Sequence, residues 1–317
     1  MAVKVFVDGS EGTTGLRIYE RFEGRDNIEL LKINPDLRKD PEERRRMINS
    51  SDITFLCLPD AAARESVSLI DKDNDHVTII DTSTAHRTEP GWIYGFPELD
   101  KKQRELIRNS KRIAVPGCYA TGFISIAHPM IASGLMDNTY PVSAFALSGY
   151  SGAGKKAIAV YEGDEKPEEF NSPREYALSQ QHKHLKEMKI ISGLSRTPLF
   201  SPVVDDYYSG MFVTLPFYTD MLNGVSEPSK IHEMFEKYYE GEKFIHVMPF
   251  GAESETGGFI GANNRSGWDG LELFVTGNEE RALVTTRFDN LGKGASGAAV
   301  QCLNIVLGVD EAKGLCL

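Results

Sequence analysis

Cys118 is the residue whose type and position are most suggestive of chemistry. A short apolar run over 113–115 ends at Pro116-Gly117, and an apolar segment over 119–132 follows. The first run is typical of a strand and the second of a helix, so the thiol is expected at a helix N-terminus. There, backbone N–H groups and the helix dipole favour a thiolate. A buried small residue in a tight turn is the alternative, but the position favours a nucleophile.

A pair of histidines, His182 and His184, is the second chemical feature. They share a face only if the backbone is extended, because in a helix they would point about 200° apart. We therefore expect one to act directly and the other to support it; a solvated helix start is the alternative. His184 is slightly favoured as acid/base, since Glu187 lies three residues later and would share its helical face. No further ligands are spaced for a metal, so none is expected.

The N-terminal segment is typical of a nucleotide-binding loop. A strand pattern over 3–7 leads into a glycine-rich turn, and helical periodicity follows over 16–22. This order is the opening of a dinucleotide-binding βαβ unit, although the spacing G-x-x-G-x-x-G is by itself weak and an ordinary turn is the alternative. The residues suited to a pyrophosphate are Gly9, Ser10, Gly12, Thr13, Thr14 and Gly15.

The residues after the second expected strand, 28–33, bear on the choice of nucleotide. An NAD enzyme would place an acid at the end of this strand, where Asn34 stands. Arg38 and Lys39 follow and suit a 2′-phosphate, so we expect NADP. Asp36 keeps NAD open.

Polar residues follow two further β-rich runs, 52–58 and 77–81. Ligands bind at the carboxyl ends of strands in an open α/β sheet, so Ser83 is expected near the cofactor. Arg87 is the candidate for holding a phosphate group with two donors, although it could instead pair with a surface carboxylate.

The sequence after residue 118 has a different texture. Alternating runs at 143–147, 211–217, 244–248, 271–276 and 282–287 are typical of a sheet with one solvated face. We predict a Rossmann-type parallel-sheet nucleotide domain over 1–117 and an α+β catalytic domain with a mostly antiparallel sheet over 118–291. Residues 292–317 are expected to form a C-terminal helix that returns to the first domain.

Composition excludes several classes of protein. The formal net charge of −11 over 317 residues repels nucleic acid. The four scattered cysteines indicate reduced thiols and a cytoplasmic setting. A strand pattern at residue 3 leaves no room for a signal peptide, and no apolar run approaches membrane-spanning length.

Together, a nicotinamide fold, a helix-capped cysteine and a histidine pair resemble the aspartate-semialdehyde dehydrogenase superfamily. Within it, the sequence is most similar to the shorter form of the N-acetyl-γ-glutamyl-phosphate reductase family. The matching motifs are Pro116-Gly117-Cys118-Tyr119, the loop at 9–15, Tyr-Gly-Phe-Pro-Glu at 94–98, the glycine-rich run at 148–154, Tyr176 with His182, His184 and Glu187, and Asn-Leu-Gly-Lys-Gly-Ala at 290–295.

The resemblance implies NADPH-dependent reduction of an acyl phosphate through a thioester on Cys118, in arginine biosynthesis. It implies that the His182/His184 segment supplies the acid/base, with Tyr176 and Glu187 bracing it. It also implies a small-molecule substrate near Ser148 and Gly149, and a homo-oligomer, a dimer or tetramer. The cofactor set that we expect is Gly9, Ser10, Gly12, Thr13, Thr14, Gly15, Arg38, Ser83, Gly149, Asn290 and Gly294.

Other functions remain open from the sequence. Aspartate-semialdehyde dehydrogenase or an amino-adipyl relative would use the same cysteine with a different substrate pocket. A Cys-His acyl hydrolase would not need the glycine-rich loop, and an NADP-sensing module would not need Cys118 or the histidines.

Overall fold

The computed structural model describes residues 2–317, and these divide into two compact units. The first unit contains the residues up to Gly117 together with Ala295–Leu315. The second contains Cys118–Gly294 together with Cys316–Leu317. None of the helices within residues 2–317 combines the length and the apolar character needed to cross a membrane.

The first unit is built on a six-stranded sheet in which every pairing is parallel, which confirms the predicted Rossmann-type sheet. Its order is β2-β1-β3-β4-β6-β5. The chain leaves β1 for β2 on one side and then crosses to β3 on the other, so the order reverses between β1 and β3. The strands are β1 (Val3–Asp8), β2 (Ile28–Leu31), β3 (Ile53–Leu56), β4 (Thr78–Asp81), β5 (Ile93–Tyr94) and β6 (Arg112–Ala114).

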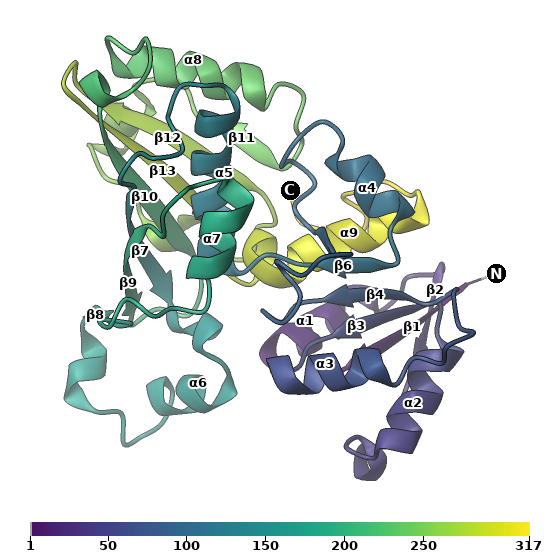
Figure 1. The fold of residues 1–317 in the computed structure, drawn as a ribbon. Coiled ribbons are helices and arrows are strands. Elements are labelled where there is room, and N and C mark those ends of the chain that lie inside the picture. The colour runs from purple at the N-terminus through teal and green to yellow at the C-terminus, as the bar shows by residue number, and fades with distance from the viewer. Residues whose placement is uncertain (1) are drawn as a thin grey trace. The chain divides into compact units, whose positions relative to one another are not determined.

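Helices cover both faces of this sheet (Figure 1). One apolar cluster joins Val5 and Phe55 of the sheet to Ile18 of α1 (Thr13–Phe22), and α4 (Gln103–Asn109) and α9 (Gly297–Leu307) belong to it too. Residues that point to the other face of the sheet, such as Phe6, pack on α2 (Pro41–Ser50). Helix α3 (Asp60–Ser68) lies on that same face. The C-terminal helix therefore contributes core residues to the unit in which the chain begins.

The second unit contains a seven-stranded sheet of order β11-β12-β13-β10-β7-β9-β8. Four of its six pairings are antiparallel, as predicted; β7–β9 and β11–β12 are parallel. Its strands are β7 (Ser143–Gly149), β8 (Arg174–Glu175), β9 (Leu199–Asp205), β10 (Met211–Tyr218), β11 (Ile245–Val247), β12 (Leu271–Gly277) and β13 (Arg281–Phe288).

One face of this sheet is covered by helices. Helix α5 (Cys118–Ala132) packs on β10 and β13, α7 (Leu185–Ser192) packs on α5, and α8 (Pro228–Tyr238) packs on β12 (Figure 1). A short helix, α6 (Lys155–Tyr161), follows the glycine-rich run.

Candidate active site and cofactor pocket

Cys118 is the first residue of α5, directly after the Pro116-Gly117 break that follows β6. Its half-buried thiol lines a cavity of about 280 Å³ in the second unit. Backbone N–H groups of the first helical turn lack intrahelical acceptors, so this end of α5 stabilises negative charge. The other lining residues are Tyr119, Ser148, Gly149, Gly152, Ala153, Tyr176, His182, Lys183 and Val204.

Two glycines allow the walls of this cavity to come close together. A Cβ at Gly294 would lie 2.9 Å from the Cβ of Cys118, and one at Gly149 would lie 2.6 Å from the carbonyl oxygen of Tyr207. Neither space admits a side chain. Gly149 thus lines the cavity that holds Cys118, and its predicted contact with the cofactor stays a prediction.

Asn290 ties together the loops behind this cavity. Its side-chain oxygen accepts a 2.9 Å hydrogen bond from the N–H of Gly210, and its amide nitrogen donates to Oγ of Ser151 over 2.9 Å. The amide is buried and makes both contacts within the second unit. Its predicted role in holding NADP stays a prediction.

The histidines lie on a loop that β9 holds in place. The amide nitrogen of Gln180 donates to the carbonyl oxygen of Phe200 over 2.9 Å, and the Phe200 N–H donates back to the Gln180 side-chain oxygen over 3.0 Å. Ala177 and Gln180 adopt positive φ angles of 53° and 56°. Such left-handed residues are uncommon outside glycine and asparagine and are often found near functional sites.

The two histidine rings are in contact, with centroids 4.7 Å apart. Helix α7 begins only at Leu185, so the pair precedes the helix and the opposed helical geometry does not apply. Nδ1 of His182 accepts a 3.1 Å hydrogen bond from the backbone N–H of His184. His182 lines the cavity, whereas His184 is 4% exposed and is not among the lining residues. The geometry therefore favours His182 over His184, which was slightly favoured from the sequence.

Two tyrosines close the cavity beside the thiol. The hydroxyl groups of Tyr119 and Tyr176 are hydrogen-bonded to each other. Burial raises the pKa of both well above the usual range, and the charge of Cys118 raises each pKa further. Both hydroxyls therefore stay protonated near neutral pH. Glu187, in the first turn of α7, is buried and lies outside the cavity lining.

Lys183 is a lining residue that the sequence reasoning passed over. Lys183 lies between His182 and His184 in the sequence, so the segment that identified the histidines also contained the lysine. Ala153 and Val204 also line the cavity, and Val204 was missed because β9 was not predicted. Residues 2–317 contain no cluster of three or more His, Cys, Asp or Glu side chains able to hold a metal ion.

A second cavity, of about 260 Å³, lies in the first unit where the strand order reverses. Gly9 has a φ of 88°, and a Cβ there would meet the Cys57 carbonyl oxygen at 2.4 Å, so only glycine fits. Ligands of open α/β sheets bind at such a reversal point. The lining residues lie at the ends of three strands: Asp8, the last residue of β1, with Gly9, Ser10, Glu11 and Gly12 after it; Ile33, Pro35, Arg38 and Lys39 after β2; and Cys57 and Leu58 after β3.

This cavity suits a dinucleotide with a 2′-phosphate. Gly12 is the N-cap of α1, and Thr13, Thr14 and Gly15 form its first turn, where backbone N–H groups favour an anion. Arg38 and Lys39 line the cavity, but Asn34 and Asp36 do not. Instead, Asn34 caps the short helix Pro35–Leu37 by accepting the Asp36 N–H over 3.0 Å. No carboxylate from the segment after β2 is thus among the lining residues.

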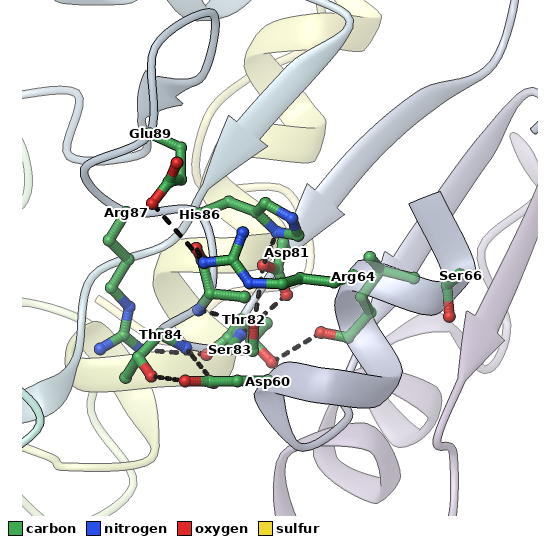
Figure 2. A network of polar contacts seen from close by, with 12 residues as sticks. Asp60, Arg64, Ser66, Asp81, Thr82, Ser83, Thr84, His86, Arg87 and Glu89 are labelled. Atoms are coloured by element: carbon green, nitrogen blue, oxygen red, sulfur yellow. Dashed lines mark hydrogen bonds and ion pairs between the residues drawn. The ribbon is translucent and has the colours of Figure 1, made fainter. Parts of the chain in front are cut away.

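Asp81, at the end of β4, anchors the loop that carries Ser83 and Arg87 (Figure 2). Its carboxylate accepts from Oγ of Ser83 over 2.7 Å and lies 2.6 Å from Nδ1 of His86, which stacks on Trp92. Arg87 donates to the carbonyl oxygens of Val115 and Thr82 over 2.8 and 2.9 Å. Ser83 and Arg87 lie outside the lining of the first unit's cavity, so their predicted ligand contacts stay predictions.

Comparisons with known proteins agree along the whole chain. Residues 4–107 match the NAD binding domain of semialdehyde dehydrogenases, and residues 118–290 match their dimerisation domain. The N-acetyl-gamma-glutamyl-phosphate reductase 2 of Nostoc sp. is 46% identical, covering 98% of this chain and 99% of its own length. The reductase of Sinorhizobium medicae is 44% identical over 97% of this chain and 99% of its own length.

Solved structures show the same fold at low sequence identity. Aspartate semialdehyde dehydrogenase from Francisella tularensis has a TM-score of 0.72 at 15% identity, covering 96% of this chain and all of its own. The Candida albicans enzyme, solved with NADP, has a TM-score of 0.61 at 12% identity, covering 97% and 99%. The chain therefore belongs to the semialdehyde dehydrogenase family and, within it, to the N-acetyl-γ-glutamyl-phosphate reductases.

Proposed function

We propose that this chain reduces N-acetyl-γ-glutamyl phosphate to N-acetylglutamate semialdehyde with release of phosphate, as a step of arginine biosynthesis. The observation that carries the proposal is that Cys118 and His182 line one cavity in a chain whose full-length relatives bear this reductase name. Cys57, Cys118, Cys302 and Cys316 carry thiols rather than disulfides, in keeping with the cytoplasm as the proposed location.

Cys118 is the nucleophile in this proposal. Its thiolate attacks the γ-acyl carbonyl carbon, and the bond to phosphate breaks, which leaves a thioester on Sγ and free phosphate. Backbone N–H groups at the start of α5 stabilise the oxyanion that forms on the carbonyl oxygen. NADPH, when bound, supplies a hydride to the thioester carbonyl. Collapse of the resulting thiohemiacetal releases the aldehyde and restores the thiolate.

His182 holds and moves the proton at the carbonyl oxygen. Since its Nδ1 accepts the His184 N–H, the proton of the neutral ring is on Nε2. Nε2–H can donate to the developing oxyanion and recover the proton when the thiohemiacetal collapses. Tyr119 and Tyr176 stay protonated beside the same sulfur, and because one hydroxyl donates to the other, at most one O–H of the pair can donate to the substrate.

Lys183 is the candidate for the substrate's anionic groups. Among the lining residues of this cavity it alone is a lysine or arginine. The acyl phosphate carries a carboxylate and a phosphate, and an ammonium at the cavity wall would attract both. Arg87 remains the candidate for the departing phosphate.

The residues of the first unit that would hold NADPH are those of its cavity. The loop from Gly9 to Gly12 and the first turn of α1 suit the pyrophosphate, and Arg38 and Lys39 suit the 2′-phosphate. Cys57 packs against the loop rather than reacting, because burial raises the pKa of its thiol to about 12.

The exposed face of the second sheet supports a homodimer. Phe145, Leu199, Tyr218 and Leu283 are exposed by 45, 65, 58 and 45%. They alternate with residues that face α5, so they share the opposite face of β7, β9, β10 and β13. The region that carries them matches a dimerisation domain. We assign this face to a second copy of the chain.

The test follows nicotinamide absorbance in both directions. NADPH should be oxidised with N-acetyl-γ-glutamyl phosphate and far more slowly with aspartyl phosphate. In reverse, NADP reduction with N-acetylglutamate semialdehyde should require phosphate, because phosphate must cleave the thioester. Comparable rates with aspartyl phosphate would indicate aspartate-semialdehyde dehydrogenase, and release of free acid without any nicotinamide would indicate a hydrolase.

A further inference from the structure

The first unit's cavity contains an ion pair that the dinucleotide fold does not require. Oε1 of Glu11, on the loop between β1 and α1, contacts a terminal nitrogen of Arg38, on the segment after β2. Both residues line the cavity. Their side chains are 59% and 47% exposed, so the pair lies at the mouth and is open to solvent.

The carboxylate of Glu11 resembles, as a partner for arginine, the 2′-phosphate of the ligand proposed for this cavity. A guanidinium binds a carboxylate and a phosphate in the same way, through a planar pair of N–H donors. A 2′-phosphate held by two donors of Arg38 would compete for the terminal nitrogen that Glu11 now contacts. The Glu11 carboxylate and the 2′-phosphate would also repel each other, because both would lie beside the same guanidinium.

We infer that Glu11 reduces the selectivity for NADPH over NADH: its carboxylate competes with the 2′-phosphate of NADPH for Arg38. The inference rests on the proposed use of NADPH. NADH carries a hydroxyl at this position and does not need the guanidinium, so Glu11 weakens NADPH binding and leaves NADH binding nearly unchanged. Glu11 thus reduces the preference for NADPH over NADH that Arg38 and Lys39 create.

Solvent exposure limits the size of the effect. Exposed ion pairs contribute little free energy, so removing the Glu11 charge should tighten NADPH binding by about fivefold rather than by orders of magnitude. Salt screens exposed charges, and the gain should therefore shrink as ionic strength rises.

The experiment compares Glu11→Gln with the wild-type full chain by calorimetry, using two probes that lack nicotinamide. Adenosine 2′,5′-bisphosphate and adenosine 5′-monophosphate differ only in the 2′-phosphate. Glu233→Gln is the matched control, because Glu233 is an exposed member of an ion pair with Lys230 on α8 and its change alters net charge equally.

Glu11→Gln should lower the Kd of the bisphosphate by about fivefold and change that of the monophosphate by less than twofold. Glu233→Gln should change neither. In an Arg38→Gln background most of the Glu11 effect should disappear, since the competition requires the guanidinium. An equal change for both probes, or no change, overturns the inference.

A loss of monophosphate binding in Glu11→Gln also overturns it, because the carboxylate would then accept from the ribose 2′-hydroxyl as in NAD enzymes. Failure of the NADPH assignment itself is seen in the wild type, which would then bind both probes equally. The two failures are thus read from different comparisons.

Discussion

Gly294 lies so close to Cys118 that a Cβ on it would stand 2.9 Å from the Cys118 Cβ. A methyl group at residue 294 could not be accommodated by a side-chain rotation, because the Cβ of Cys118 is bonded directly to the backbone of α5. Gly294→Ala should therefore displace the nucleophile and lower kcat at least tenfold. Gly277→Ala is the control: it is even more crowded, with the Arg281 carbonyl oxygen at 2.1 Å, but it is the last residue of β12 and not one of the residues that line the cavity. It should lower Tm and spare kcat, whereas equal kcat for Gly294→Ala and wild type would contradict the prediction.

The hydrogen bond from His184 to His182 predicts a division of labour. His182→Asn should lower kcat by about 10²-fold or more, the usual contribution of a general acid or base. His184→Asn keeps the backbone N–H that orients His182, so its effect on kcat should be smaller. Steady-state kinetics of both variants, with thermal unfolding as a control for folding, makes the comparison. A larger kcat loss in His184→Asn would return the acid/base role to His184.

Local patterns predicted the parts of the fold that are local. The strand, loop and helix around Gly9 and the break before Cys118 were found because apolar periodicity and Pro or Gly mark them within a few residues. Strand β9 was not predicted. It contains Pro202, which has no N–H to donate to a neighbouring strand, yet β9 lies between β7 and β8 with Pro202 opposite Ala146.

The candidate site was less accessible to such reasoning. The place of His182 depends on Gln180 pairing with Phe200, twenty residues further on, and on left-handed φ angles at Ala177 and Gln180. No local periodicity records these contacts. The pairing of Glu11 with Arg38, across an intervening helix and strand, escaped for the same reason.

Cys118 should be the thiol most readily alkylated at mildly acidic pH. A helix N-terminus favours the thiolate form, so Cys118 should react faster than the other three cysteines. Cys57 should stay unreactive at neutral pH, because burial raises its pKa to about 12 and it deprotonates only as pH approaches that value. Cys302 is buried and should be labelled slowly, whereas Cys316 is exposed and accessible to the reagent.

Timed iodoacetamide labelling with peptide mapping at two pH values tests this order. Loss of NADPH oxidation should follow labelling of Cys118, and Cys118→Ser should abolish turnover while keeping cofactor binding. Cys316→Ser should retain full activity. Substantial reductase activity in Cys118→Ser would end the thioester mechanism.

The assignment of a second copy to the exposed sheet face predicts a change of mass on substitution. Leu283→Glu places a charge on this face, on β13, and should convert the dimer to a monomer. Light scattering after size-exclusion chromatography measures the molecular mass in solution. Leu178→Glu is the control, since Leu178 is exposed by 73% but lies on the loop before the histidines. A wild-type chain that is monomeric at micromolar concentration, or a dimer in Leu283→Glu, would contradict the assignment.

Arg87 allows a test between a phosphate ligand and a structural tether. Its donors to Val115 and Thr82 hold the loop after β4 against the end of β6, and hydrogen bonds from a charged group contribute about 1.5–3 kcal/mol. Arg87→Lys keeps the charge but loses the planar fork, so Tm should fall whatever the role in catalysis. If Arg87 also holds the departing phosphate, as we expect, KM for phosphate in the reverse reaction should rise more than KM for the aldehyde.

Arg64→Lys is the control, because Arg64 likewise donates to a backbone carbonyl, that of Ala85, in the same network. It should leave the ratio of the two KM values unchanged. An unchanged ratio in Arg87→Lys as well would restrict Arg87 to holding the loop.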